Sequence, residues 1–221
     1  MYAEDTYASG ARAARHLVVP TLLVATSFGI AAVGLGWGVV APVVMSAMVF
    51  SGASQFATLA IIGAGGSLAA AVLASSLIAS RFLVIGSALA PSMRGGPLQR
   101  VLEGQAMVDT SLVLARTEEA CYGSRRLLGS SAPQYAAWIL GTAVGVALAP
   151  WLPDPHALGL DALFPAFFVV LVAGELRDRA SWVTMVVAAV TTLMLIPVVP
   201  AGMQVVLACL AVLAGRAARR A

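Results

Sequence analysis

The 77 residues from Leu17 to Met93 contain one charged side chain, that of Arg81, and it lies inside an apolar run. A soluble domain cannot be built from such a stretch, because each of its helices or strands needs a polar face toward water. The lipid bilayer is the natural solvent for it. A guanidinium in the bilayer costs roughly 2.5–3.5 kcal/mol on insertion scales, so we expect Arg81 to have a partner, a water-filled cavity or a substrate.

Composition places the whole chain in the same class. Hydrophobic residues make up 60% and charged residues 10%, whereas soluble domains carry about 25% charged residues. We therefore predict an all-α, polytopic membrane bundle in the cell (cytoplasmic) membrane. The formal net charge of +3 reports orientation rather than nucleic-acid binding, because no aromatic residues interleave with the basic ones. Cys121 and Cys209 have no metal-ligand spacing, so we expect inert thiols and neither metal nor cofactor.

The apolar segments predict about six to eight spans in one transport domain at 17–215, between tails at 1–16 and 216–221. The N-terminal residues do not resemble a signal peptide, because Glu4 and Asp5 precede Arg12 and Arg15. The segment at 98–119 is helical in pattern but ambiguous, because it carries Glu103 and Asp109. The remaining predicted segments are 17–40, 41–62, 67–90, 134–151, 160–175, 182–199 and 201–215.

Basic residues orient the second half. If the four late segments each cross, the arginines at 125–126, 177–179 and 216–220 share the cytoplasmic side with both termini. The first half has two solutions. If 41–62 crosses, 98–119 must cross back, which gives eight spans; if 41–62 is re-entrant, six remain. We favour the larger number.

A weak internal repeat in the sequence supports a binding site near the centre of the bundle. Residues 36–42 and 159–165 share a Gly-x5-Pro frame, and each opens a shorter, interrupted segment. Interrupted segments in matching positions of two halves point to a transporter's binding site. Coincidence between two Gly/Pro-rich turns is the alternative.

The stretch Ser51-Gly52-Ala53-Ser54-Gln55 puts polar side chains and a helix-weakening glycine at mid-membrane depth. Backbone groups freed at such a break must be satisfied by side chains, water or a ligand. We therefore predict a broken-helix binding site here. Close helix packing is the alternative reading, because small residues also line helix interfaces in lipid. Gln55 favours function, since a full amide is costlier to bury than a serine.

Three charged residues are further candidates. Arg81 suits a carboxylate, which a planar guanidinium binds through two parallel hydrogen bonds, although an ion pair with Asp109 would also explain it. Snorkelling is disfavoured, because Arg81 lies well inside its span, ten residues before Pro91. Asp109 lies in an apolar frame where desolvation favours proton binding. Asp161 is a proton-coupling candidate too, but it lies at a predicted segment start, where helix capping explains it.

Three function classes are disfavoured. An intramembrane serine protease would need a base near Ser51 or Ser54, and no His or Lys lies inside a predicted span. Nucleotide-driven pumping by this chain alone would need a Gly-x4-Gly-Lys-[Ser/Thr] loop, which the sequence lacks. A channel is also disfavoured, because no repeated ring of charges is visible.

With these residues in view, the chain resembles the AzlC-type branched-chain amino-acid permeases from about Phe28 to Ala214. The strongest match is the run from Met45 to Phe56, which is similar to the family's Ser…Val-Phe-x-Gly-x-x-Gln-Phe signature. The Arg81 segment, the Asp109 stretch and the run 159–168 match further family blocks.

The chain also departs from the family pattern. The usual Asn-x-Arg-His is represented by Ser80-Arg81-Phe82, which keeps only the arginine, and Thr110 stands where the family often has a second acidic residue. The resemblance implies export of hydrophobic amino acids together with a small four-span AzlD-type membrane partner. Branched-chain specificity is implied by the resemblance alone.

Our leading hypothesis is a transporter that moves hydrophobic amino acids outward by alternating access. Ser51, Gly52, Ser54 and Gln55 would form the site, Arg81 would hold the carboxylate or its counter-ion, and Phe56 and Phe168 would receive the side chain. Asp109 would couple to protons or neutralise Arg81. The competing hypothesis is a non-transporting scaffold subunit, whose polar residues serve only helix packing.

Overall fold

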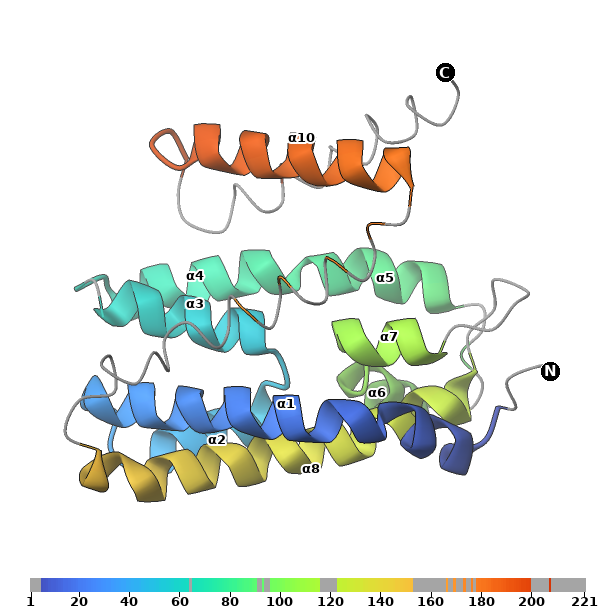
Figure 1. Cartoon of the computed structure of the whole chain (residues 1–221), viewed down its shortest axis with the longest axis horizontal. Helices are drawn as coiled ribbons and strands as arrows, with labels where there is room; N and C mark the ends of the chain where they lie inside the picture. The colour runs from blue at the N-terminus through green and yellow to red at the C-terminus, as the bar shows by residue number, and fades with distance from the viewer. Residues whose placement is uncertain are drawn as a thin grey trace.

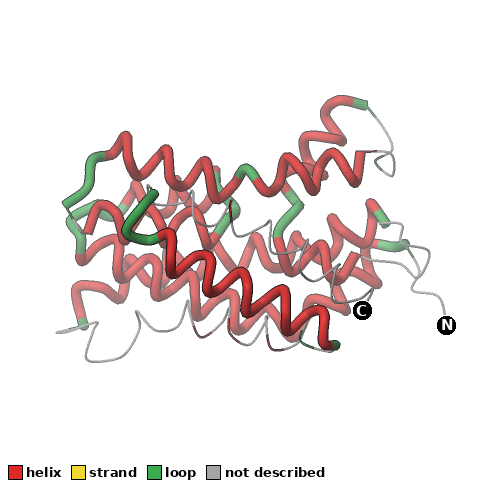
Figure 2. The backbone as a smooth tube through the Cα atoms, turned by 90° about the horizontal axis from the view of Figure 1, so that it is seen from above, coloured by secondary structure: helices red, strands yellow, loops and turns green. Residues whose placement is uncertain are grey.

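The computed structural model describes residues 5–63, 65–90, 93, 96–115, 123–152, 166, 169, 173, 176, 178–199 and 207; of the side chains, those of Arg81, Val84 and Ala88 are not described. Helices and loops account for all of this part of the chain, with no strand (Figure 2). Except for residues 166, 169, 173 and 207, the segments expected at 160–175 and 201–215 lie outside the described ranges, as does the second Gly-x5-Pro frame at 159–165. The helices are α1 (Tyr7–Gly34), α2 (Val40–Met48), α3 (Gly52–Gly63), α4 (Leu68–Ala79), α5 (Arg81–Leu89), α6 (Pro97–Gln105), α7 (Asp109–Ala115), α8 (Ser124–Leu148, continued by a 3-10 turn at Ala149–Trp151) and α10 (Arg179–Leu195).

Two long apolar helices, α1 and α8, form the backbone of the molecule. With 28 and 25 residues, they measure about 42 and 37 Å at 1.5 Å per residue, enough for about 30 Å of hydrocarbon. Among the described residues, these two helices, α8 with its 3-10 turn included, meet the length and hydropathy needed to cross a membrane. α1 begins ten residues before the expected 17, because the Thr6 hydroxyl accepts the Ser9 backbone N–H at 3.1 Å and caps the helix.

Glycines let α1 and α8 approach until their backbones touch. A Cβ added to Gly29 would lie 2.4 Å from the Thr142 carbonyl oxygen, and one added to Gly145 would lie 2.1 Å from that of Thr26. Near the helix starts, Gly10 meets Arg126 in the same way. Residues near the start of α1 therefore contact residues near the start of α8, and later residues contact later ones, so the two helices run parallel (Figure 1). Such small-residue contacts are the usual means of close helix packing in lipid.

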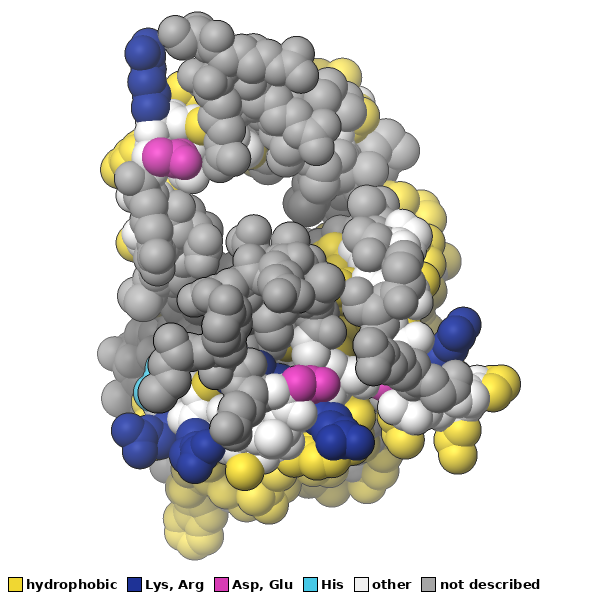
Figure 3. All heavy atoms as spheres, turned by 90° about the vertical axis from the view of Figure 1, so that its right-hand side faces the viewer, with side chains coloured by type: hydrophobic (Ala, Val, Ile, Leu, Met, Phe, Trp, Pro, Cys, Tyr) yellow, Lys and Arg dark blue, Asp and Glu magenta, His cyan; other side chains and the backbone are white. Residues whose placement is uncertain are grey.

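α1, α8 and α10 all begin at one end of the bundle, which we call the basic end (Figure 1). Basic side chains gather on this face (Figure 3). The opposite end, where α1 finishes and α2 starts, is called the distal end. The described arginines at the starts of these three helices are Arg12, Arg15, Arg125, Arg126 and Arg179.

The second predicted segment folds as a helical hairpin. α2 ends at Met48, residues 49–51 are not helical, and α3 runs back toward its starting end (Figure 1). Gly63, at the close of α3, lies beside the Leu35 side chain at the distal end. The hairpin's arms of 9 and 12 residues reach about 14 and 18 Å, too short to cross. The structure therefore differs from our preference for one crossing helix at 41–62, and the number of spans remains a prediction.

The segment expected at 67–90 contains α4 and α5, which run end to end from the distal to the basic end (Figure 1). A turn at Ser80 separates them. The Ser80 hydroxyl donates to the Leu77 carbonyl oxygen at 2.6 Å, and such local side-chain bonds compete with the regular helix ladder. Arg81 follows this turn as the first residue of α5.

The segment at 98–119 is also not one helix. Its described part forms α6 and α7, separated at residues 106–108. The Ser111 hydroxyl donates to the Ala106 carbonyl oxygen at 2.7 Å and accepts the Val108 N–H at 3.0 Å, and these bonds stabilise the break. α7 closes near the start of α8, where Arg126 Nε donates to the Leu114 carbonyl oxygen at 2.6 Å. α6 and α7 therefore form a second hairpin at the basic end.

The two hairpins approach each other beside the middle of α8. Gln105 Nε2, at the end of α6, donates to the Met48 carbonyl oxygen at the end of α2, at 3.3 Å. The Tyr135 hydroxyl donates to the Ala47 carbonyl oxygen at 2.5 Å, and its ring stacks edge-on against Phe50 with centroids 5.1 Å apart. Helix breaks from opposite ends thus meet at mid-depth, where unsatisfied backbone groups are tolerated only if protein, water or ligand surrounds them.

Candidate functional site

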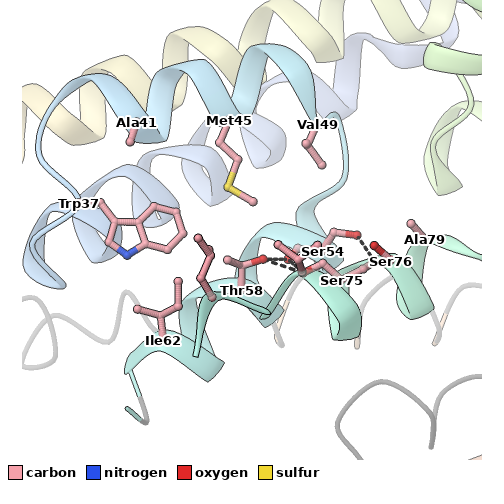
Figure 4. Close-up of a pocket in the computed structure, with 12 residues that line it drawn as sticks. Trp37, Ala41, Met45, Val49, Ser54, Thr58, Ile62, Ser75, Ser76 and Ala79 are labelled. Carbon is pink, nitrogen blue, oxygen red and sulfur yellow. Dashed lines mark hydrogen bonds between the residues drawn. The ribbon is translucent and has the colours of Figure 1, made fainter. Parts of the chain in front are cut away.

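A pocket of about 590 Å³ opens between α2 and the pair formed by α3 and α4 (Figure 4). It is framed by α2 and the turn before it on one side and by α3 and α4 on the other. Its volume lies in the range that holds small organic ligands. The lining residues are Trp37, Ala41, Met45, Val49, Ser54, Thr58, Ile62, Leu68, Val72, Ser75, Ser76 and Ala79.

Hydroxyl groups form one side of this pocket, which we call the hydroxyl row: Ser54 and Thr58 on α3, and Ser75 and Ser76 on α4. Thr58 Oγ1 and Ser75 Oγ lie 2.6 Å apart, and each is placed to donate to the Ser54 carbonyl oxygen, at 2.9 and 3.0 Å. Ser54 Oγ donates to the Ser75 carbonyl oxygen at 3.3 Å. These bonds tie α3 to α4 and hold several oxygen atoms at fixed positions on the pocket wall.

The opposite side is apolar. Figure 4 shows Trp37 and Met45 facing the hydroxyl row across the pocket, with Ile62 below them. None of the described lining residues is charged. The described part of the site can therefore take a small molecule with an aliphatic part, whose polar groups would bind hydroxyls and backbone groups there.

Gln55 points away from the pocket and into a closed circuit of hydrogen bonds, which we call the Gln55 ring. Its side chain is fully buried, with 0% exposed. Trp138 Nε1 donates to Gln55 Oε1 at 2.8 Å, and Gln55 Nε2 donates to Ser46 Oγ at 3.2 Å. Because an indole N–H can only donate, it determines which end of the amide faces α8.

Ser46 and Thr142 complete the ring. Their hydroxyl oxygens are 2.8 Å apart, and Thr142 Oγ1 donates to the Trp138 carbonyl oxygen at 2.9 Å. Since a hydroxyl has one hydrogen, Ser46 must donate to Thr142. Both residues are fully buried. The ring joins α2 and α3 to α8, so it holds the two arms of the first hairpin against a long helix.

The other predicted residues of the first hairpin lie at its tip. Ser51 Oγ donates to Ser54 Oγ at 3.1 Å, and Gly52 is the first residue of α3. Phe56 packs edge-on against Phe28, with ring centroids 5.7 Å apart. Of the five candidates between 51 and 56, Ser54 is the one on the pocket wall.

The charged candidates lie elsewhere. Arg81 opens α5 and Asp109 opens α7. Asp161 and Phe168 lie outside the described residues, so their predicted roles remain predictions. The ion pair between Arg81 and Asp109 also remains a prediction, because it depends on the Arg81 side chain.

Our sequence analysis missed the hydroxyl row on α4 and the partners of Gln55. Ser75-Ser76 interrupts an otherwise apolar run in 68–79, and such a polar pair inside a span is a signal in the sequence for this row. Trp138 and Thr142 carried no comparable signal, because their sequence separation from Gln55 hides the contact.

Comparison with known proteins bears on the family of this chain. The family described as AzlC protein matches residues 17–152, more than half of the chain. The chain belongs to the AzlC family. This is a membrane transporter family, not an enzyme family, and it is linked to branched-chain amino-acid transport.

Two relatives support the assignment. The inner membrane protein YgaZ of Escherichia coli (strain K12) is 29% identical over 190 residues, covering 80% of this chain and 76% of the relative. An uncharacterized membrane protein of Archaeoglobus fulgidus is 29% identical over 165 residues, covering 74% and 73%. No solved structure gives a significant match. The chain is thus similar to membrane proteins of a bacterium and an archaeon, and it is a membrane protein itself.

Proposed function

We propose that this AzlC-family protein exports hydrophobic amino acids, branched-chain ones among them, across the cell membrane. It does so by alternating access and together with a small AzlD-type membrane subunit. The main support for this proposal is the pocket, in which an apolar wall faces the hydroxyl row. A branched aliphatic side chain suits the apolar wall of Trp37 and Met45, with Ile62 of α3 beside it, and the substrate's amino and carboxylate groups suit the hydroxyls and nearby backbone groups.

The two hairpins support alternating access. Each enters from a different end, and they meet at the hydrogen bond between Gln105 and Met48. A hairpin anchored at one end can move without breaking the long α1–α8 pair. Opening each hairpin in turn would expose a central ligand to opposite sides of the membrane.

The orientation follows from the basic end. Arginines at the starts of α1, α8 and α10 favour a cytoplasmic position for this end, and for the N-terminus with it (Figure 3). The pocket lies beside the hairpin of the distal end, so substrate in this arrangement would face the outside.

Efflux of radiolabelled leucine from proteoliposomes tests the proposal, with the purified protein reconstituted alone and with its small membrane partner. Two neighbouring residues of α4 provide a matched pair: Val72 lines the pocket and is 56% exposed, while Leu73 does not line it and is 57% exposed. Val72→Trp should fill the pocket and abolish efflux, and Leu73→Trp should leave it near wild type.

Equal efflux by the two variants would overturn the pocket as the transport site. If wild-type protein gives no efflux in either reconstitution and leucine does not raise its thermal stability, the scaffold function replaces the transporter. Glutamate as a competitor provides the specificity control, because a pocket without a described charged lining residue should not accept a second carboxylate.

A further inference from the structure

Glu103 has a buried carboxyl group and is not one of the residues that line the pocket. It lies on α6, inside the second hairpin, and is 1% exposed. Two donors bind one of its oxygens: Gln99 Nε2 donates to Oε1 at 2.9 Å, and Ser124 Oγ makes a short hydrogen bond to the same atom. Oε2 is buried and has no hydrogen-bond partner among the described residues.

This asymmetry distinguishes the two protonation states. An ionised carboxylate shares its charge between both oxygens, so half of that charge would lie on a buried oxygen without a donor. Burial of such charge is costly. A neutral carboxyl group keeps Oε1 as the carbonyl acceptor, where both donors point, and carries its proton on Oε2. The arrangement of donors therefore matches the protonated acid.

Among the described residues, the surrounding charged groups do not compensate an ionised Glu103. On α6 itself Arg100 is exposed, and on α8 Arg125 is exposed as well. Arg126 uses its Nε on the Leu114 carbonyl oxygen, and its backbone N–H binds Asp5. α7 contributes Asp109, a like charge.

No described basic side chain makes an ion pair with Glu103. The described His, Cys, Asp and Glu residues also form no group that could hold a metal ion. The proton is therefore the cation that this site suits.

We propose that Glu103 is a proton-binding site, occupied in this conformation and emptied when α6 separates from α8. Its hydrogen-bond partner Ser124 is the first residue of α8, at the basic end, so a proton on Oε2 would pass to water on that side. Movement of the second hairpin then changes the protonation of Glu103. That coupling to transport rests on the proposed function, whereas the protonation itself does not.

Infrared spectroscopy of the full-length protein tests the protonation directly. The measurement uses a detergent without ester carbonyls, at neutral pH, in H2O and D2O. The wild type should show a protonated-carboxyl C=O band that shifts in D2O. Glu103→Gln should lose this band, and the control Asp5→Asn, which changes an exposed carboxyl group, should keep it.

A second variant leaves the carboxyl group in place. Ser124→Ala removes the O–H donor to Oε1, so the same band should remain and move to higher frequency. If Glu103→Gln does not fold, the frequency shift in Ser124→Ala tests the assignment of the band to Glu103. Any of three results would overturn the proposed protonation of Glu103. The band is absent in the wild type, it persists in Glu103→Gln, or its frequency is unchanged in Ser124→Ala.

Coupling is measured separately in proteoliposomes. A pH gradient should change the leucine efflux rate of the wild type and should not change that of Glu103→Gln. A variant that still responds to the gradient overturns the coupling role. If the wild type moves no leucine but the infrared assignments hold, the transport function fails and the proton site stands.

Discussion

Trp138 Nε1 donates a 2.8 Å hydrogen bond to Gln55 Oε1, across a sequence separation of 83 residues. The bond joins α3 to α8 inside a fully buried ring that also contains Ser46 and Thr142. A buried polar ring stabilises only while each of its members is satisfied. Gln55 therefore acts as the anchor of the first hairpin and positions Ser54, its neighbour, on the pocket wall.

Replacing Gln55 by leucine should break this anchor. Gln55→Leu leaves the indole N–H without an acceptor, which costs about 1–3 kcal/mol. We expect a loss of that size in the free energy of unfolding and loss of the leucine response, with membrane insertion intact. The measurement is equilibrium unfolding in mixed micelles, alongside Trp138→Phe and the double variant. Strictly additive effects would show that the two residues are not coupled.

Glycine at the α1–α8 contact should be irreplaceable. Gly145→Ala puts a methyl group where the Thr26 carbonyl oxygen would be 2.1 Å away, and overpacking of this kind costs about 1–3 kcal/mol. Gly34→Ala is the control, because no atom lies within 4 Å of an added Cβ there. Thermal unfolding should show a lower midpoint for Gly145→Ala and little change for Gly34→Ala. A similar midpoint for both would contradict the close packing.

The hydroxyl row should contribute to ligand binding rather than to folding alone. Thr58→Val keeps the shape but removes the O–H next to Ser75, and we expect a leucine KM raised about tenfold, as for loss of a polar contact worth about 1.4 kcal/mol. Thr192→Val on α10 removes an equivalent bond, from Thr192 Oγ1 to the Ala188 carbonyl oxygen at 2.8 Å, away from the pocket. If both variants raise KM equally, the row has no specific role.

Arg81 and Asp109 should behave as a pair. Asp109→Asn should destabilise the protein, because an unpaired buried arginine costs several kcal/mol. Arg81→Gln combined with Asp109→Asn should recover part of that loss in a double-mutant cycle. Independent effects would leave Asp109 without this partner, and its role would then be read from the pH dependence of efflux in Asp109→Asn.

The carboxylate clamp is tested by a smaller change. Arg81→Lys retains the charge but cannot reproduce two parallel hydrogen bonds, so leucine efflux should fall well below the wild-type rate. Circular dichroism and size-exclusion chromatography check that the variant is folded. Wild-type efflux by a folded Arg81→Lys protein would remove the clamp role.

The sequence by itself determined that this is a membrane protein and where one of its helical segments is broken. Transfer of a side chain into lipid depends on that residue and its close neighbours, so the single charge in 17–93 predicted a membrane bundle. The polar stretch at 51–55 likewise predicted a broken segment, and the helix ends within three residues of it. Local signals of this kind need no knowledge of the rest of the chain.

Only the tertiary structure decided how those segments are arranged. Hydropathy is the same whether 41–62 crosses or turns back, and it turns back because Ser46 and Gln55 both bind α8. It is also the same whichever way Gln55 faces, so the sequence could not separate Ser54 on the pocket wall from Gln55 in the ring. The pocket depends on Ser75 of α4 lying beside Thr58 of α3, and that contact exists only once the hairpin has packed.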